Sequence, residues 1–126
     1  MSLQTPLARV KGLGSAHQGS HHWLMQRITA VTLAVLFIWF AFSFACLLGK
    51  PYSDVKTWVS TSYNTVLLIS FLIAGFYHAI LGLQVVIEDY VPAACKKIVL
   101  LVAMKVILSI LGISAIVAVL RTALGS

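Results

Sequence analysis

Three side chains in one apolar stretch of this sequence could do chemistry. His78 lies inside residues 67–90, which read LLISFLIAGFYHAILGLQVVIEDY, and Asp89 and Tyr90 close the stretch. As a helix the stretch is long enough to cross a bilayer, which takes roughly 20 apolar residues. An ionisable group at membrane depth is energetically costly, so His78 is a functional candidate by default.

Helical spacing relates these residues to one another. Asp89 follows His78 by eleven residues, which at about 100° per residue returns to nearly the same face, roughly 16 Å further along at the membrane rim. The Tyr90 phenol could donate a hydrogen bond to a carbonyl there, or it could be an interface aromatic. Asp89 could instead be a solvated charge at a helix end. Arg27 enters at the same membrane level and could pair with Asp89 or with an anionic cofactor group.

The lone imidazole of His78 could bind a metal or form a hydrogen bond to a neighbouring helix. Gly75 and Gly82 lie three residues before and four residues after it, and therefore on its face of the helix. Small residues there would let a flat macrocycle approach, or they would let another helix pack closely. The other histidines precede the first apolar run. A six-coordinate haem on His78 would therefore need its second axial ligand from another chain.

Composition indicates a membrane protein. Of the 126 residues, 60% are hydrophobic and only 10% are charged, whereas a soluble domain carries about 25% charged residues. The formal net charge is +6, but the charges flank apolar runs, which favours lipid headgroups over nucleic acid as a partner. The sequence contains no CxxC pair, Gly-rich phosphate loop or hydrolytic constellation. We therefore expect no catalytic site in this chain alone.

The apolar runs predict an all-α membrane protein with three transmembrane helices. Pro51 and Pro92 should end the first two helices, because proline cannot continue a helix. The connector 50–62 carries interface aromatics, and a short amphipathic segment could lie on the surface there. Cys46 and Cys95 should lie near opposite membrane faces, too far apart for a disulfide. The predicted ranges are a polar arm over 1–27 and a three-helix membrane anchor over 28–126, with helices over about 28–48, 63–88 and 98–120.

The basic residues predict the orientation. With three helices, the N-terminal arm and the loop after the second helix share one side of the membrane. That side holds five basic residues against three on the other, which favours a cytoplasmic N-terminus. Lys105 lies inside the third helix, where its side chain could reach the headgroups or contact a lipid or a partner subunit. The two sets are Arg9, Lys11, Arg27, Lys96 and Lys97, and Lys50, Lys56 and Arg121.

Two segments resemble a known family. Residues 78–91, HAILGLQVVIEDYV, resemble the H-x3-G-x-Q-x4-DYV signature of the succinate dehydrogenase hydrophobic membrane anchor subunit. Residues 12–16, GLGSA, and 22–30, HWLMQRITA, resemble the segment before the first helix in its proteobacterial form. The Ser-Pro element and the His-Arg pair typical of the sister cytochrome b556 subunit are absent from the corresponding segment.

The resemblance implies specific roles. His78 would be one axial ligand of haem b, with the other ligand from the cytochrome b556 subunit. Tyr90 would hydrogen-bond a ubiquinone carbonyl with Asp89 beside it, and Arg27 would lie near the haem propionates and the quinone pocket. The chain would sit in the bacterial inner membrane and hold a flavoprotein and an iron–sulfur protein at its cytoplasmic face. Electrons from succinate would pass through the iron–sulfur centres to quinone.

Three other interpretations remain open from sequence. A fumarate reductase anchor would use the same groups in the opposite direction. A small transporter subunit would relay protons through His78 and Asp89, although the first and third helices supply almost no polar residue at mid-depth. A purely structural membrane protein is the last.

The predicted orientation can be tested with reporter fusions. Fusions after Pro92 should report a cytoplasmic location, and fusions after Pro51 and Ser126 a periplasmic one. The measurement is the activity of reporters that fold on only one side of the membrane. The opposite pattern would put the segment with Asp89 and Tyr90 on the wrong side for soluble electron-transfer partners.

Overall fold

The computed structural model describes residues 7, 10 and 17–125, and this part of the chain is built from helices without strands. Three of the helices are long and apolar enough to cross a membrane. The predicted all-α class with three membrane-spanning segments is therefore confirmed. The helices are α2 (His17–Leu47), α3 (Tyr52–Ser60), α4 (Ser62–Tyr90) and α5 (Ala94–Leu124).

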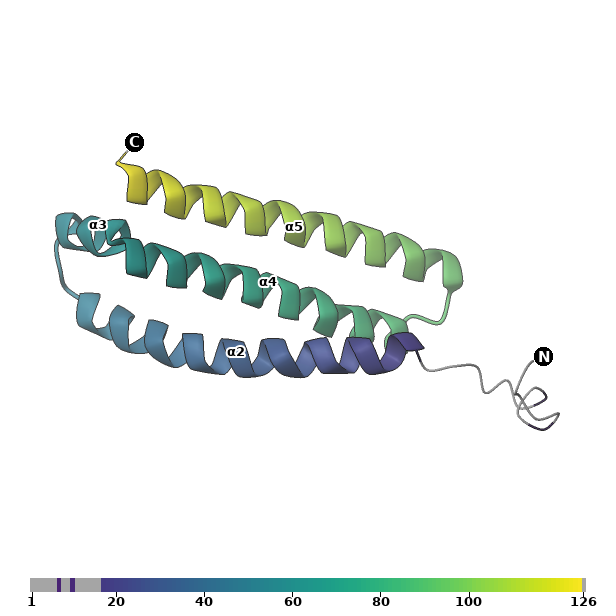
Figure 1. The fold of residues 1–126 in the computed structure, drawn as a ribbon. Coiled ribbons are helices and arrows are strands. Elements are labelled where there is room, and N and C mark those ends of the chain that lie inside the picture. The colour runs from purple at the N-terminus through teal and green to yellow at the C-terminus, as the bar shows by residue number, and fades with distance from the viewer. Residues whose placement is uncertain (1–6, 8–9, 11–16, 126) are drawn as a thin grey trace.

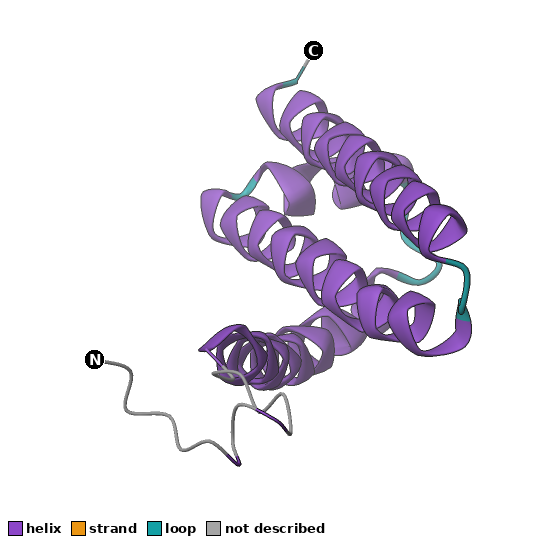
Figure 2. Cartoon of the chain, turned by 90° about the vertical axis from the view of Figure 1, so that its right-hand side faces the viewer, coloured by secondary structure: helices purple, strands orange, loops and turns teal. Residues whose placement is uncertain are grey.

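The three long helices lie side by side in one layer with α4 in the middle, and the short α3 lies across one end (Figure 1). The view turned by 90° shows the same order, α2 then α4 then α5 (Figure 2). Leu68 and Leu81, both on α4, are the buried apolar side chains in the part that the structure describes. Both broad faces of the layer therefore present apolar side chains to lipid or to a partner.

The first helix begins earlier than predicted. It starts at His17, eleven residues before Ile28, so the predicted helix start at about residue 28 is wrong. The segment 17–27 is polar but contains no proline, and two of its polar side chains, His22 and Gln26, are partly buried. The rest of the predicted arm lies largely outside the described residues.

The helix ends follow the predicted signals. The chain leaves α2 through Gly49, whose φ of 75° suits glycine, and Pro51 precedes α3. The segment left open by sequence is α3, and its Trp58 ring stacks on Trp39 of α2 at 5.7 Å between centroids. Asn64 Nδ2 donates to the Trp58 carbonyl at 2.8 Å. These contacts fix the start of α4 against α2.

The opposite end of α4 is held by the turn into α5. α4 ends at Tyr90, two residues beyond the predicted end at about 88 but still before Val91 and Pro92. Lys97 Nζ donates to the Glu88 carbonyl at 2.8 Å, so a cation satisfies a backbone acceptor in the last turn. Cys46 and Cys95 are free and exposed; Cys46 is one residue before the end of α2, and Cys95 is the second residue of α5. The end of α2 and the start of α5 lie at opposite ends of the layer (Figure 1).

Close packing of α5 on α4 depends on Gly112. This residue is buried, and a Cβ built on it would lie 3.2 Å from Phe76 Cγ. Small residues at such crossings let membrane helices approach closely, where packing contacts drive their association.

We expect Gly112→Leu to separate α4 from α5 and to destabilise the protein by about 1–3 kcal/mol, the usual range for overpacking. The measurement is thermal denaturation of the complex purified in detergent. Ser114→Leu is the control, because it adds the same side chain at an exposed position. A Gly112→Leu melting temperature equal to wild type would contradict the packing role.

Candidate functional site

A single side-chain hydrogen bond joins α2 to α4 at membrane depth. Thr29 Oγ1 lies 2.9 Å from His78 Nδ1, and the contact is partly buried. It is the only side-chain hydrogen bond of His78 within the described residues. The ring is therefore held at Nδ1, and Nε2 has no partner in this part of the chain. His78 is the predicted site residue, whereas Thr29 was given no role from sequence.

Gly75 and Gly82 both lie beside side chains of α2. A Cβ on Gly75 would lie 3.8 Å from Leu33 Cδ2, and one on Gly82 would lie 3.5 Å from Gln26 Nε2. Both distances are ordinary van der Waals contact. A methyl group would therefore fit at either position, so α2 packs on both sides of His78 without requiring glycine there.

Asp89 and Tyr90 occupy the last turn of α4. The helix is continuous from Ser62 to Tyr90, so the predicted same-face relation of His78 and Asp89 holds along it. Tyr90 is the last helical residue and not the residue after the helix; its side chain is 82% exposed. From His78 to Tyr90 the rise is about 18 Å. His78 therefore lies at a different depth from Asp89 and Tyr90, on the same rigid helix.

Arg27 does not pair with Asp89. Its guanidinium lies 5.5 Å from the centroid of the Trp23 ring, and this cation–π contact is its only recorded interaction among the described residues. Arg27 precedes Thr29 by two residues, about 200° around the helix. Since Thr29 faces α4, Arg27 points away from it. Its side chain is exposed.

A polar cavity of about 330 Å³ lies at the rim end of the α2–α4 contact. Gln84 Nε2 donates to Glu88 Oε1 at 2.9 Å inside it. His22 Nε2 and Gln26 Oε1 are buried and have no hydrogen-bond partner in the described structure. The cavity is lined by Gly19, His22, Gln84 and Glu88.

Sequence reasoning missed this polar face of α2, although a signal was present. His22, Gln26 and Thr29 are spaced by four and three residues, which places them on one face of a helix. The spacing could have identified the face, but not the helix against which it packs.

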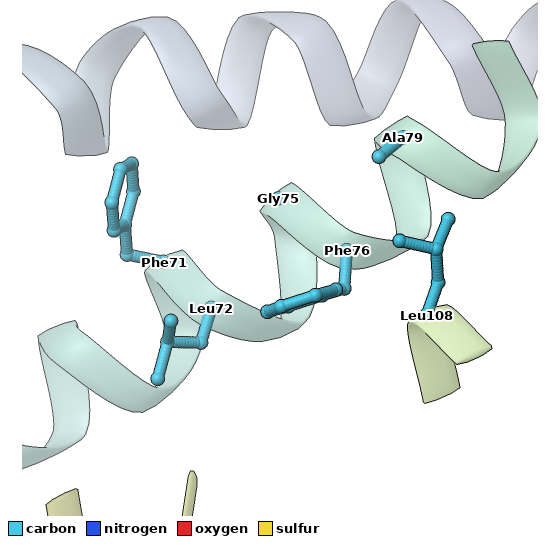
Figure 3. Close-up of a pocket in the computed structure, with 6 residues that line it drawn as sticks. All are labelled: Phe71, Leu72, Gly75, Phe76, Ala79 and Leu108. Atoms are coloured by element: carbon cyan, nitrogen blue, oxygen red, sulfur yellow. The ribbon is translucent and has the colours of Figure 1, made fainter. Parts of the chain in front are cut away.

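A second cavity, of about 240 Å³, opens between α4 and α5. Figure 3 shows five of its residues along α4 and one, Leu108, on α5. All six are apolar, so this groove offers surface and no reactive group. The other five are Phe71, Leu72, Gly75, Phe76 and Ala79.

Within the described residues, no three His, Cys, Asp or Glu side chains gather closely enough to hold a metal ion.

Comparison with known proteins gives a consistent result. The model of the succinate dehydrogenase/fumarate reductase transmembrane subunit family matches residues 1–112. The succinate dehydrogenase hydrophobic membrane anchor subunit of Rickettsia bellii is 40% identical over 114 residues, which are 88% of each chain. That of Paracoccus denitrificans is 33% identical over 94 residues, which are 74% of this chain and 72% of the relative.

The chain belongs to the succinate dehydrogenase membrane anchor family. The resemblance found from residues 78–91 is thereby confirmed. As a multi-pass membrane anchor subunit, the chain works with other subunits of a complex. Family membership also sets aside the interpretation as a transporter subunit and that as an unrelated structural protein.

Proposed function

We propose that this anchor subunit provides His78 as one axial ligand of haem b and Tyr90 as a hydrogen-bond donor at a ubiquinone site. The observation that carries the proposal is the state of His78, held at Nδ1 by Thr29 and unpaired at Nε2 among the described residues. An intramembrane imidazole with one nitrogen fixed and the other unpaired is the arrangement found in ligating histidines.

The donors present fit a haem shared between two chains. Nε2 of His78 is a neutral nitrogen ligand of the kind that haem iron accepts. The second axial ligand would come from the cytochrome b556 subunit. Bound haem b would supply a one-electron carrier inside the membrane. Arg27 would approach the propionates, since its charge is exposed and no carboxylate of the described residues pairs with it.

Tyr90 and Asp89 are placed for the quinone at the rim. An amphipathic quinone head can reach an exposed phenol at the membrane surface from the lipid, while electrons and protons arrive from the water side. A phenol that donates to a quinone carbonyl stabilises the negative charge that develops on its oxygen during reduction. Asp89 lies beside Tyr90 at the exposed end of α4 and would act on that hydrogen bond.

The proposal extends to the cellular setting. The chain would lie in the bacterial inner membrane with its N-terminus in the cytoplasm, and the iron–sulfur and flavoprotein subunits would dock where α4 ends. The relatives from Rickettsia bellii and Paracoccus denitrificans carry succinate dehydrogenase names, which favours succinate oxidation over the reverse fumarate reduction. Within such a complex the chain would contribute to the quinone site without being catalytic alone.

Replacing His78 with leucine should remove an axial ligand while keeping an apolar side chain of similar reach. We expect the purified complex to lose most of its low-spin haem signal, with a smaller effect on quinone reduction because that site lies about 18 Å away. The measurement is the reduced-minus-oxidised spectrum. Tyr77→Leu, at the exposed neighbouring position, is the control. An unchanged spectrum in His78→Leu would identify His78 as a packing residue.

Replacing Tyr90 with phenylalanine keeps the ring and removes only the hydroxyl. Loss of a donor that stabilises developing negative charge raises a barrier by about 2.7–4 kcal/mol, so succinate–quinone turnover should fall on the order of a hundredfold or more. Succinate oxidation by an artificial acceptor that takes electrons from the soluble subunits should persist, with haem content intact.

Tyr63→Phe is the matched control for Tyr90→Phe, because Tyr63 is an exposed tyrosine at the other end of the same helix. It should leave quinone turnover unchanged. Wild-type quinone reduction by Tyr90→Phe would make Tyr90 an interface aromatic and move the donor to a partner subunit.

A further inference from the structure

We infer that Thr29 is the positioning residue for His78: its hydroxyl accepts a hydrogen bond from Nδ1–H and so leaves the lone pair of Nε2 available to a metal. The inference rests on the proposed ligation of haem by His78 and adds the group that orients the ligand. The juxtaposition behind it is the 2.9 Å contact between Thr29 Oγ1 and His78 Nδ1, across the α2–α4 interface.

The position of the Thr29 proton assigns the tautomer. Thr29 Oγ1 lies 2.8 Å from the Met25 carbonyl and 3.2 Å from the Gln26 carbonyl. Carbonyl oxygens only accept, so the single hydroxyl proton has a preferred acceptor in the preceding turn of α2, a common bond for threonine in helices. The lone pairs of Oγ1 then remain for a donor on His78. In a neutral imidazole that donor is Nδ1–H, and Nε2 is left without a proton.

The other tautomer is less favourable at this depth. With the proton on Nε2, Thr29 would have to turn its hydroxyl toward Nδ1 and give up the bond to the Met25 carbonyl. One side-chain hydrogen bond would form where two form otherwise. In addition, Nε2–H would be a donor without an acceptor among the described residues, in an apolar layer where an unpaired polar group is costly.

The neighbouring contacts keep Thr29 at the ring. Leu33 Cδ2 and Gln26 Nε2 of α2 lie 3.8 Å and 3.5 Å from the positions that a Cβ on Gly75 and on Gly82 would take. The α2–α4 contact therefore continues on either side of His78, and the Thr29 hydroxyl lies between these two packed positions. A partner that accepts the second ring N–H fixes the orientation of a ligating imidazole and raises its basicity, and its loss typically weakens metal binding about 10- to 100-fold.

The chain offers a matched set of variants. Thr29→Val keeps the shape and removes the hydroxyl, whereas Thr29→Ser keeps the hydroxyl and removes the methyl group. Thr32→Val is the control, because Thr32 makes the same type of bond to the carbonyl four residues earlier, Oγ1 to Ile28 at 2.9 Å, but is exposed. All variants are examined in the purified complex.

We expect Thr29→Val to retain haem about 10- to 100-fold less tightly when apomyoglobin competes for it. Its low-spin paramagnetic resonance signal should shift and its haem midpoint potential should rise, because the imidazole becomes a weaker base with a freer ring. Thr29→Ser and Thr32→Val should match wild type. None of these readouts depends on succinate turnover.

Two results would overturn the inference. In the first, Thr29→Val matches wild type in haem retention, resonance signal and potential while His78→Leu loses its haem, so the ligand stands but Thr29 does not position it. In the second, Thr29→Ser changes as much as Thr29→Val, so the methyl group and not the hydroxyl matters. If Thr29→Val fails to assemble, Thr29→Ala takes its place, because it also removes the hydroxyl and can be compared with Thr29→Ser, which likewise lacks the methyl group. Failure of haem ligation itself would show separately, as an unchanged spectrum in His78→Leu.

Discussion

The arrangement of this subunit depends on one polar contact inside an apolar layer, the hydrogen bond between Thr29 and His78. A membrane offers no water to His78 Nδ1, so its partner has to come from the neighbouring helix. That requirement sets the register of α2 against α4. Leu33 and Gln26 of α2 lie beside Gly75 and Gly82 on either side of this contact. The same contact leaves one imidazole nitrogen available to a group from outside the chain.

The central helix α4 carries candidate functional residues at two different depths in the membrane. His78 lies inside the membrane, and Asp89 and Tyr90 lie in the exposed last turn of the same continuous helix. A rigid helix keeps their separation constant, and the bond from Lys97 to the Glu88 carbonyl holds the rim end. Because the three long helices form a single layer (Figure 1), both broad faces stay available. This suits a subunit whose haem site would be completed by another chain.

The sequence predicted the parts of this structure that depend on local signals. Apolar length located the three spans, and Pro51 and Pro92 located two of the helix ends, because these features act within one segment. It did not predict that α2 begins at His17 or that Thr29 meets His78. Both depend on which face of one helix packs against another. The residues on one face of a helix do not show which other helix packs against that face. The sequence also left open an ion pair between Arg27 and Asp89, because both lie at the same membrane level. This pair does not form, because Arg27 points away from α4.

The most direct test of the central claim is the reduced-minus-oxidised spectrum of the wild-type complex, purified through this chain and combined with identification of its subunits. The account predicts haem b in stoichiometric amount with the low-spin signature of two imidazole ligands, together with a cytochrome b556 subunit. A complex that oxidises succinate and reduces quinone but contains no haem would contradict the assignment of His78 as a ligand. A haem in that complex that is not low-spin would contradict the same assignment.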